Sequence, residues 1–173
     1  GQKKYVMHLQ NSKKHGLYTE WNKDGRLTKD IDYDMGIPIS EYIVEYDGDS
    51  YVEINRRNSQ LSGSWIKWYA NGKKKEEGVY KYGKKCGLWT GWHANGEKKY
   101  QGKYVDGKPD DLYTELDDRG RLTKSIEYNE GLVLTEYHIQ RDESGTTEYH
   151  KRNGVLDGQW TRWYKNGNKA EEG

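Results

Sequence analysis

The sequence predicts an all-β fold: an elongated, twisted, single-layer antiparallel meander of about seven β-hairpin repeats of about 24 residues each. Three observations support this. A pattern close to Gly-x-Trp-x-x-Trp-Tyr-x-Asn-Gly-x-Lys-x-x-Glu-Gly-x-Tyr recurs, dipeptides such as Asn71-Gly72 mark tight turns at its centre, and glycine is too frequent for a long helix. We expect residues 1–173 to form one hairpin-repeat array.

The copies differ in how well they keep the pattern. The clearest begin at Gly63, Gly87 and Gly158, weaker ones begin at Gly16 and Asp111, and two eroded ones fall within residues 40–60 and 135–156. A larger duplication is superimposed, because a shift of 95 residues lays residues 1–78 over residues 96–173. Leu17-Tyr-Thr-Glu20, for example, then meets Leu112-Tyr-Thr-Glu115. A fixed period is typical of stacked repeats, in which no unit buries its apolar face alone.

Tight turns set the expected register. Asn71-Gly72 and its equivalents predict type I′ turns, which need positive φ at both central residues. Counting outward sets Trp65 opposite Gly78 and Tyr69 opposite Lys74. Aromatic rings then cover strand glycines, which are otherwise costly. The residues to which we assign this structural role are Gly63, Trp65, Asn71, Gly72, Gly78, Tyr80, Gly87, Trp89, Asn95, Gly96, Gly102, Tyr104, Gly158, Trp160, Asn166 and Gly167.

The same register brings opposite charges together at one repeat position. The expected pairs are Lys67 with Glu76, Glu20 with Lys29, Glu115 with Lys124, and Arg162 with Glu171. Each exposed pair would contribute roughly 0.2–1 kcal/mol.

The tryptophans occupy two rows. Residues three apart on a strand have opposite parity, so the second tryptophan of each repeat points away from the first. We expect this second row, Trp21, Trp68, Trp92 and Trp163, to form a partly exposed stripe that binds a partner. The alternative is that curvature and a bulge bury both rows.

Composition limits the chemistry. Only 32% of the residues are hydrophobic, and 16 Tyr and 7 Trp supply most of the large apolar surface. The net charge of +1 argues against nucleic-acid binding.

No span of about 20 apolar residues and no signal-peptide core is visible. The chain starts without Met and stops inside a repeat, so we expect further repeats or a removed leader and leave the compartment open.

We expect no catalytic, cofactor-binding or metal site. The five His are scattered without ligand spacing, and the single Cys86 lies in a connection between hairpins without the pattern of a nucleophile. His93 stands where other copies have Tyr and is expected to be structural.

The repeat resembles the MORN-repeat variant family, which includes bacterial YwqK-type antitoxin proteins. Residues 63–80, from Gly63-Ser-Trp to Gly78-Val-Tyr80, carry the resemblance best. It implies a hairpin fold and an interaction module without catalytic residues. Some such proteins are presumed immunity partners of toxins, and related repeats in eukaryotes are associated with membranes and scaffolding.

Three functional hypotheses follow. The first is a non-enzymatic protein-binding module, with a toxin as one candidate partner. The second is a carbohydrate- or cell-wall-binding module that uses Trp and Tyr rings, which also suit choline-like cations. The third is membrane association through lysine-rich segments such as Lys84-Lys85 and Lys98-Lys99. Exposed terminal strands also make edge-to-edge self-association a fourth expectation.

Overall fold

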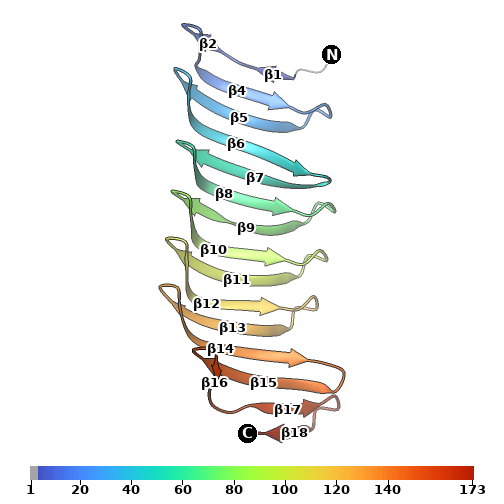
Figure 1. Ribbon diagram of the computed structural model, residues 1–173. Coiled ribbons are helices and arrows are strands. Elements are labelled where there is room, and N and C mark those ends of the chain that lie inside the picture. The colour runs from blue at the N-terminus through green and yellow to red at the C-terminus, as the bar shows by residue number, and fades with distance from the viewer. Residues whose placement is uncertain (1–3) are drawn as a thin grey trace. The chain divides into compact units, whose positions relative to one another are not determined.

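A computed structural model describes residues 4–173 and contains β-strands and turns but no helix in that range. The chain divides into two compact units, the first ending at Cys86 and the second beginning at Gly87. Each unit is an antiparallel meander in which consecutive strands pair (Figure 1). The predicted all-β meander of hairpins is therefore confirmed.

The first unit contains seven strands that lie side by side in chain order. They are β1 (Tyr5–Val6), β4 (Gly16–Trp21), β5 (Leu27–Asp34), β6 (Ile37–Asp47), β7 (Ser50–Arg57), β8 (Gln60–Trp68) and β9 (Lys74–Lys81). Between β1 and β4, strands β2 (Leu9–Gln10) and β3 (Lys13–Lys14) pair with each other. The eroded repeat within residues 40–60 forms the hairpin β6–β7, so loss of its tryptophans has not removed its strands.

The second unit continues the same plan. Its strands are β10 (Lys84–Trp92, which crosses the boundary), β11 (Lys98–Val105), β12 (Lys108–Leu116), β13 (Leu122–Asn129), β14 (Leu132–Arg141), β15 (Gly145–Arg152), β17 (Thr161–Tyr164) and β18 (Lys169–Glu172). The short β16 (Val155–Leu156) pairs with the end of β15. The eroded repeat within residues 135–156 forms β14–β15.

The predicted type I′ turns at Asn-Gly are wrong. Only the glycine of Asn71-Gly72 has a positive φ, 76°. Gly72 N donates to the Tyr69 carbonyl at 3.0 Å, and Tyr69 N donates to the Lys73 carbonyl at 2.9 Å, which defines a four-residue turn. The Asn71 Oδ1 atom accepts a hydrogen bond from Lys73 N at 3.1 Å. The asparagine therefore stabilises the turn through its side chain, and the glycine alone adopts the left-handed conformation.

Pairs of positive φ occur instead between the hairpins. Asn58 and Ser59 have φ of 48° and 63° where β7 meets β8, and Asp106 and Gly107 have φ of 49° and 85° where β11 meets β12. Each pair lies between directly opposed residues, such as Val105 and Lys108. These connections are thus tighter than the turns at Asn-Gly.

The register is correct in spite of this error. Trp65 lies opposite Gly78 and Lys67 opposite Glu76, as expected, but Trp68 then lies opposite Lys74. An extra residue, Lys75, bulges from β9 and compensates for the longer turn. The predicted pairing of Tyr69 with Lys74 is therefore wrong. Equivalent register shifts occur beside Trp21, Trp92, Leu116 and Trp163.

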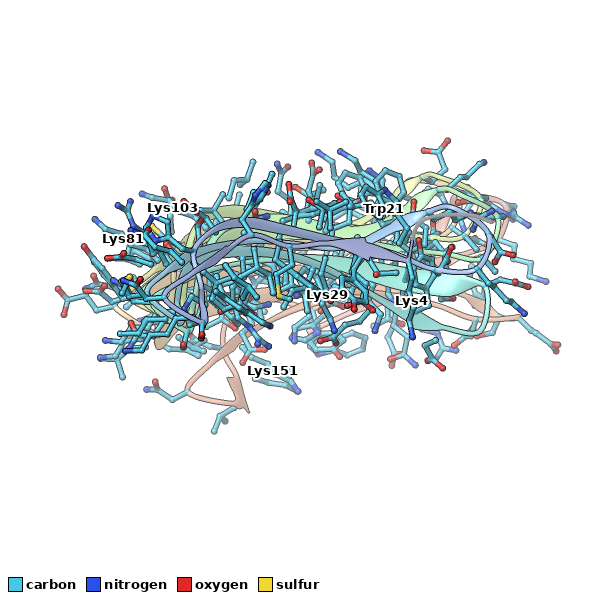
Figure 2. All side chains as sticks on the ribbon, turned by 90° about the horizontal axis from the view of Figure 1, so that it is seen from above. Lys4, Trp21, Lys29, Lys81, Lys103 and Lys151 are labelled. Atoms are coloured by element: carbon cyan, nitrogen blue, oxygen red, sulfur yellow. The ribbon has the colours of Figure 1, made fainter. Side chains whose placement is uncertain are left out.

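Each unit has two faces. We name the side that bears Trp65, Trp89 and Trp160 the glycine face, and the other side the lysine face. Side chains project from both sides of the strands, with Trp21 on one side and Lys29 on the other (Figure 2). Most of the buried apolar side chains lie on the glycine face, Ile31, Ile43 and Ile54 in the first unit and Trp89 and Ile126 in the second.

Candidate interaction surface

The first tryptophan row is structural. Trp89 lies opposite Gly102 as predicted, and only 1% of its surface is exposed. Its ring meets the edge of Tyr104 at a centroid distance of 6.3 Å, and Trp65 meets Tyr80 in the same way at 6.5 Å. Residues at these positions form the core of the hairpin.

Glycines on this face are covered by rings, some of them from an unexpected strand. A Cβ atom at Gly102 would lie 2.6 Å from the ring of Tyr113, which comes from the next hairpin. At Gly91 the covering ring is Tyr100, the residue directly opposite. Aromatic cover of the glycines therefore also joins neighbouring hairpins.

The second tryptophan row lies on the lysine face, because the bulges occur on the returning strand and leave the parity of the tryptophans unchanged. All four side chains are partly buried, and none is among the exposed large side chains of residues 4–173. The residues are Trp21, Trp68, Trp92 and Trp163.

Lysines cover two of these rings. Lys74 Nζ lies 5.9 Å from the centre of the Trp68 ring, and Lys169 Nζ lies 5.7 Å from that of Trp163. Both ammonium groups are also paired with a carboxylate three residues later, Glu77 and Glu172 respectively. The bulge places each lysine beside the second tryptophan, so these two rings of the stripe lie under charged side chains.

The predicted charge pairs occupy the expected register, but their ion pairs vary. Lys29 Nζ lies 3.4 Å from Glu20 Oε2. Lys124 faces Glu115, yet its Nζ atom lies 3.9 Å from Glu136 on the next strand. Charges at this position thus also reach across neighbouring hairpins.

Exposed aliphatic side chains share the lysine face, which the sequence analysis did not predict. In the second unit Leu88 and Leu112 are 56% and 55% exposed, and Val105 is also exposed. Leu17 and Val79 are exposed at the corresponding end of the first unit. The sequence signal was available, since Leu17, Leu88 and Leu112 occupy the second position of their repeats, which alternation directs away from the first tryptophan row.

A hollow of about 460 Å³ lies on the lysine face at the tip of β6–β7, and we name it the tyrosine pocket. Its wall includes Tyr42, Tyr46, Tyr51, Glu53 and Asp49. Tyr51 lies 5.5 Å from Tyr46 and stacks on Trp68 at 5.7 Å between ring centres. Desolvation and the nearby Glu53 carboxylate, to which its hydroxyl donates a hydrogen bond, raise the pKa of Tyr42 to about 12.

The duplicated position in the second unit carries a hollow with different chemistry, which we name the arginine pocket. Arg141 and Thr146 replace Tyr46 and Tyr51 there, and Glu148 keeps the position of Glu53. Arg141 Nη1 donates to the Leu122 carbonyl at 2.7 Å, which fixes the guanidinium in the wall.

Tyrosine–glutamate pairs recur on the glycine face. The Tyr18 hydroxyl donates to Glu20 at 2.7 Å, and the Tyr113 hydroxyl donates to Glu115 at 3.1 Å. The first bond raises the pKa of Tyr18 to about 12 and lowers the pKa of Glu20. Burial and the Glu115 carboxylate raise the pKa of Tyr113 as well.

Two of the histidines contact other parts of the fold, and the single cysteine is unpaired. Within residues 4–173 no three His, Cys, Asp or Glu side chains are grouped so that they could hold a metal ion, and Cys86 is a free thiol. His93 Nε2 lies 2.9 Å from the Leu116 carbonyl, and His138 stacks on Tyr149. Within the described residues there is also no helix long and apolar enough to span a membrane.

Comparison with known proteins identifies the class of repeat. The MORN repeat variant model matches residues 61–82, 85–106 and 156–173, which cover the hairpins with complete tryptophan pairs. These three segments are therefore similar to MORN repeat variants, and the resemblance seen in the sequence is confirmed at the level of the repeat. No curated protein matches the chain.

Proposed function

We propose that this chain is a non-enzymatic interaction protein whose lysine face binds another protein. Repeats of the MORN type commonly serve as interaction modules. The observation that supports a protein partner is the exposed aliphatic set on the lysine face, Leu88, Val105 and Leu112 in the second unit. Apolar side chains bordered by charge are typical of protein-binding surfaces.

Tryptophans of the second row support this surface without being its exposed part. The stripe of Trp21, Trp68, Trp92 and Trp163 would bind the partner together with the aliphatic side chains. The partner would displace or pair with the lysines over Trp68 and Trp163. A toxin neutralised by this chain is the partner class that the family resemblance favours. Such a complex would bury the aliphatic side chains, while the paired lysines and glutamates would lie at its rim.

The test uses a partner identified by crosslinking in the native host and then purified. We expect the double variant Leu88→Ser and Leu112→Ser to weaken binding at least about tenfold in calorimetry, because exposed apolar anchors lose their contact area. Its circular-dichroism spectrum should be unchanged, since both side chains are exposed. Leu156→Ser, an exposed aliphatic residue of the same unit beside Tyr149 and Trp160, is the matched control. Equal affinity of all three proteins would refute the proposal.

Carbohydrate binding remains the second candidate, and the rings of the tyrosine pocket favour it. Four tyrosines and two carboxylates in one hollow supply both stacking surfaces and hydrogen-bonding groups. A glycan array would reveal it as saturable binding that is lost in Tyr46→Ala.

A further inference from the structure

The tyrosine pocket combines aromatic rings with negative charge. Tyr46 is 39% exposed and lies beside Tyr51, so its ring is available to a ligand. Glu53 and Asp49 contribute two carboxylates to the wall, and Arg26 contributes one guanidinium. The carboxylates outnumber the cation, so the pocket has a net negative charge.

The arginine pocket is an internal comparison, because the duplication places the two hollows at equivalent positions. Arg121, Arg141 and Lys165 contribute three cations to its wall, against the carboxylates Asp142 and Glu148. Two tyrosine positions have become arginine and threonine, and the balance of charge has changed sign. The rest of the hairpin has kept its strands and its pairing. The difference therefore affects the hollow and not the fold.

We propose that the tyrosine pocket binds an organic ammonium group, either a lysine side chain or a quaternary ammonium. Cations are attracted to the faces of aromatic rings, and the attraction grows where the ring is partly desolvated and a carboxylate lies near. The exposed ring of Tyr46 supplies the aromatic face, Tyr51 lies beside it between Tyr46 and Trp68, and Glu53 and Asp49 supply the charge. This inference does not depend on the proposed protein-binding role of the aliphatic side chains.

Arg26 is the competing cation. The Arg26 guanidinium lies close enough to Tyr51 to oppose the rise in the pKa of its hydroxyl. Its duplicate, Arg121, is paired with Asp117 at 2.7 Å, but the position of Asp117 is occupied in the first unit by Asn22, which is uncharged. Arg26 therefore lacks this ion pair and is available to move aside for a ligand.

The experiment titrates the intact, isotope-labelled chain with choline and follows amide chemical shifts. The control ligand is dimethylbutanol, in which a tert-butyl group replaces the trimethylammonium of choline without its charge. We expect saturable shifts at Tyr46, Tyr51 and Glu53 with choline only, and about severalfold tighter binding in Arg26→Gln. A parallel titration with Nα-acetyl-lysine N-methylamide, whose side-chain ammonium is free, distinguishes a lysine side chain from a quaternary ammonium as the ligand. Tighter binding of the lysine derivative assigns the pocket to a protein side chain, and tighter binding of choline assigns it to a quaternary ammonium.

Variants that exchange the two pockets give the sharpest test. Tyr46→Arg with Tyr51→Thr should weaken choline binding by about tenfold or more, because it installs the residues of the arginine pocket. Arg141→Tyr with Thr146→Tyr should create choline binding in the second unit, and this gain is informative even if the first variant unfolds. Equal binding of dimethylbutanol, undiminished choline binding by a folded Tyr46→Arg and Tyr51→Thr variant, no gain in the reciprocal variant, or no saturation with either cation would overturn the proposal.

Discussion

The two duplicated halves place very different residue pairs at one register position. In the first unit Ile43 lies opposite Ile54, and both are buried, with 8% and 7% of their surfaces exposed. In the second unit His138 lies opposite Tyr149, and the two rings stack at 5.0 Å. His138 Nε2 also lies 3.0 Å from a carboxylate oxygen of Glu136.

This difference shows what fixes the hairpin. Both pairs have the same register although one is aliphatic and the other polar, so the identity of the pair does not determine the alignment of the strands. The turn inside the hairpin has the same length in both halves, because Tyr46 lies opposite Tyr51 and Arg141, its duplicate, lies opposite Thr146. Register is set by turns and bulges, which leaves the central side chains free to diverge.

The largest effect is expected from Ile54→Ala. Deletion of a buried aliphatic side chain loses its transfer free energy and leaves a cavity, so unfolding of the first unit should become easier by about 2–4 kcal/mol. Residue-resolved amide hydrogen exchange measures the free energy of unfolding of each unit separately. Ile37→Ala is the matched control in the same unit, because Ile37 is 70% exposed and should change the free energy by less than about 0.5 kcal/mol. A similar loss in both variants would contradict the assignment of Ile54 to the core.

A smaller loss is expected when the pair of the second unit is transplanted into the first, through Ile43→His with Ile54→Tyr. Glu41 occupies the position of Glu136, so the new imidazole would find a carboxylate partner. We expect a cost of about 1–2 kcal/mol from altered packing, below that of the cavity left by Ile54→Ala. The pattern of protected amides should be unchanged at the base of the hairpin, where Ser40 lies opposite Arg57. Loss of this pairing would show that the pair itself sets the register.

Particular residues show how far the sequence predicts this structure. Trp89 opposite Gly102 followed from counting outward from a turn, and the count succeeded although the turn type was wrong, since the longer turn and the bulge at Lys99 offset each other. Asn-Gly alone does not reveal whether the asparagine is left-handed. The lysine over Trp68 depends on the bulge, and the tyrosine pocket depends on strands β5, β6 and β7 meeting the turn that follows β8. Neither feature can be predicted from the spacing of the repeats alone.

The tyrosine–glutamate pairs are alike in the two halves, because the duplication has preserved them in both units. The folded state raises the pKa of Tyr18 from 10.0 to about 12 through its bond to Glu20, so it favours the protonated phenol. This stabilisation is complete below pH 10 and is lost as the pH rises to about 12. The pKa of Glu20 is lowered in the folded state, so its ionised form stabilises the fold. This stabilisation is lost as the pH drops below 4.5, the ordinary pKa of the side chain.

Urea denaturation at about pH 8 and about pH 12 tests this pair. We expect Tyr18→Phe to reduce the loss of unfolding free energy at alkaline pH in the first unit only. Tyr113→Phe should reduce this loss in the second unit only. Solvent screening keeps both effects below those of the buried isoleucine. An alkaline loss that is the same in both variants and in the unaltered chain would assign the dependence to other tyrosines.

The smallest effect is expected at the lysines over the second tryptophan row. Lys74 covers Trp68 in the first unit and Lys169 covers Trp163 in the second, and both are tied to a carboxylate three residues later. Lys74→Ala and Lys169→Ala should each cost no more than about 1 kcal/mol, since the contacts are solvent-exposed. The tryptophan fluorescence of each variant should shift to longer wavelength as the ring meets more water. Equal shifts would show that the two halves share this cover, whereas a shift in Lys169→Ala alone would indicate that stacking of Tyr51 on Trp68 already excludes water in the first unit.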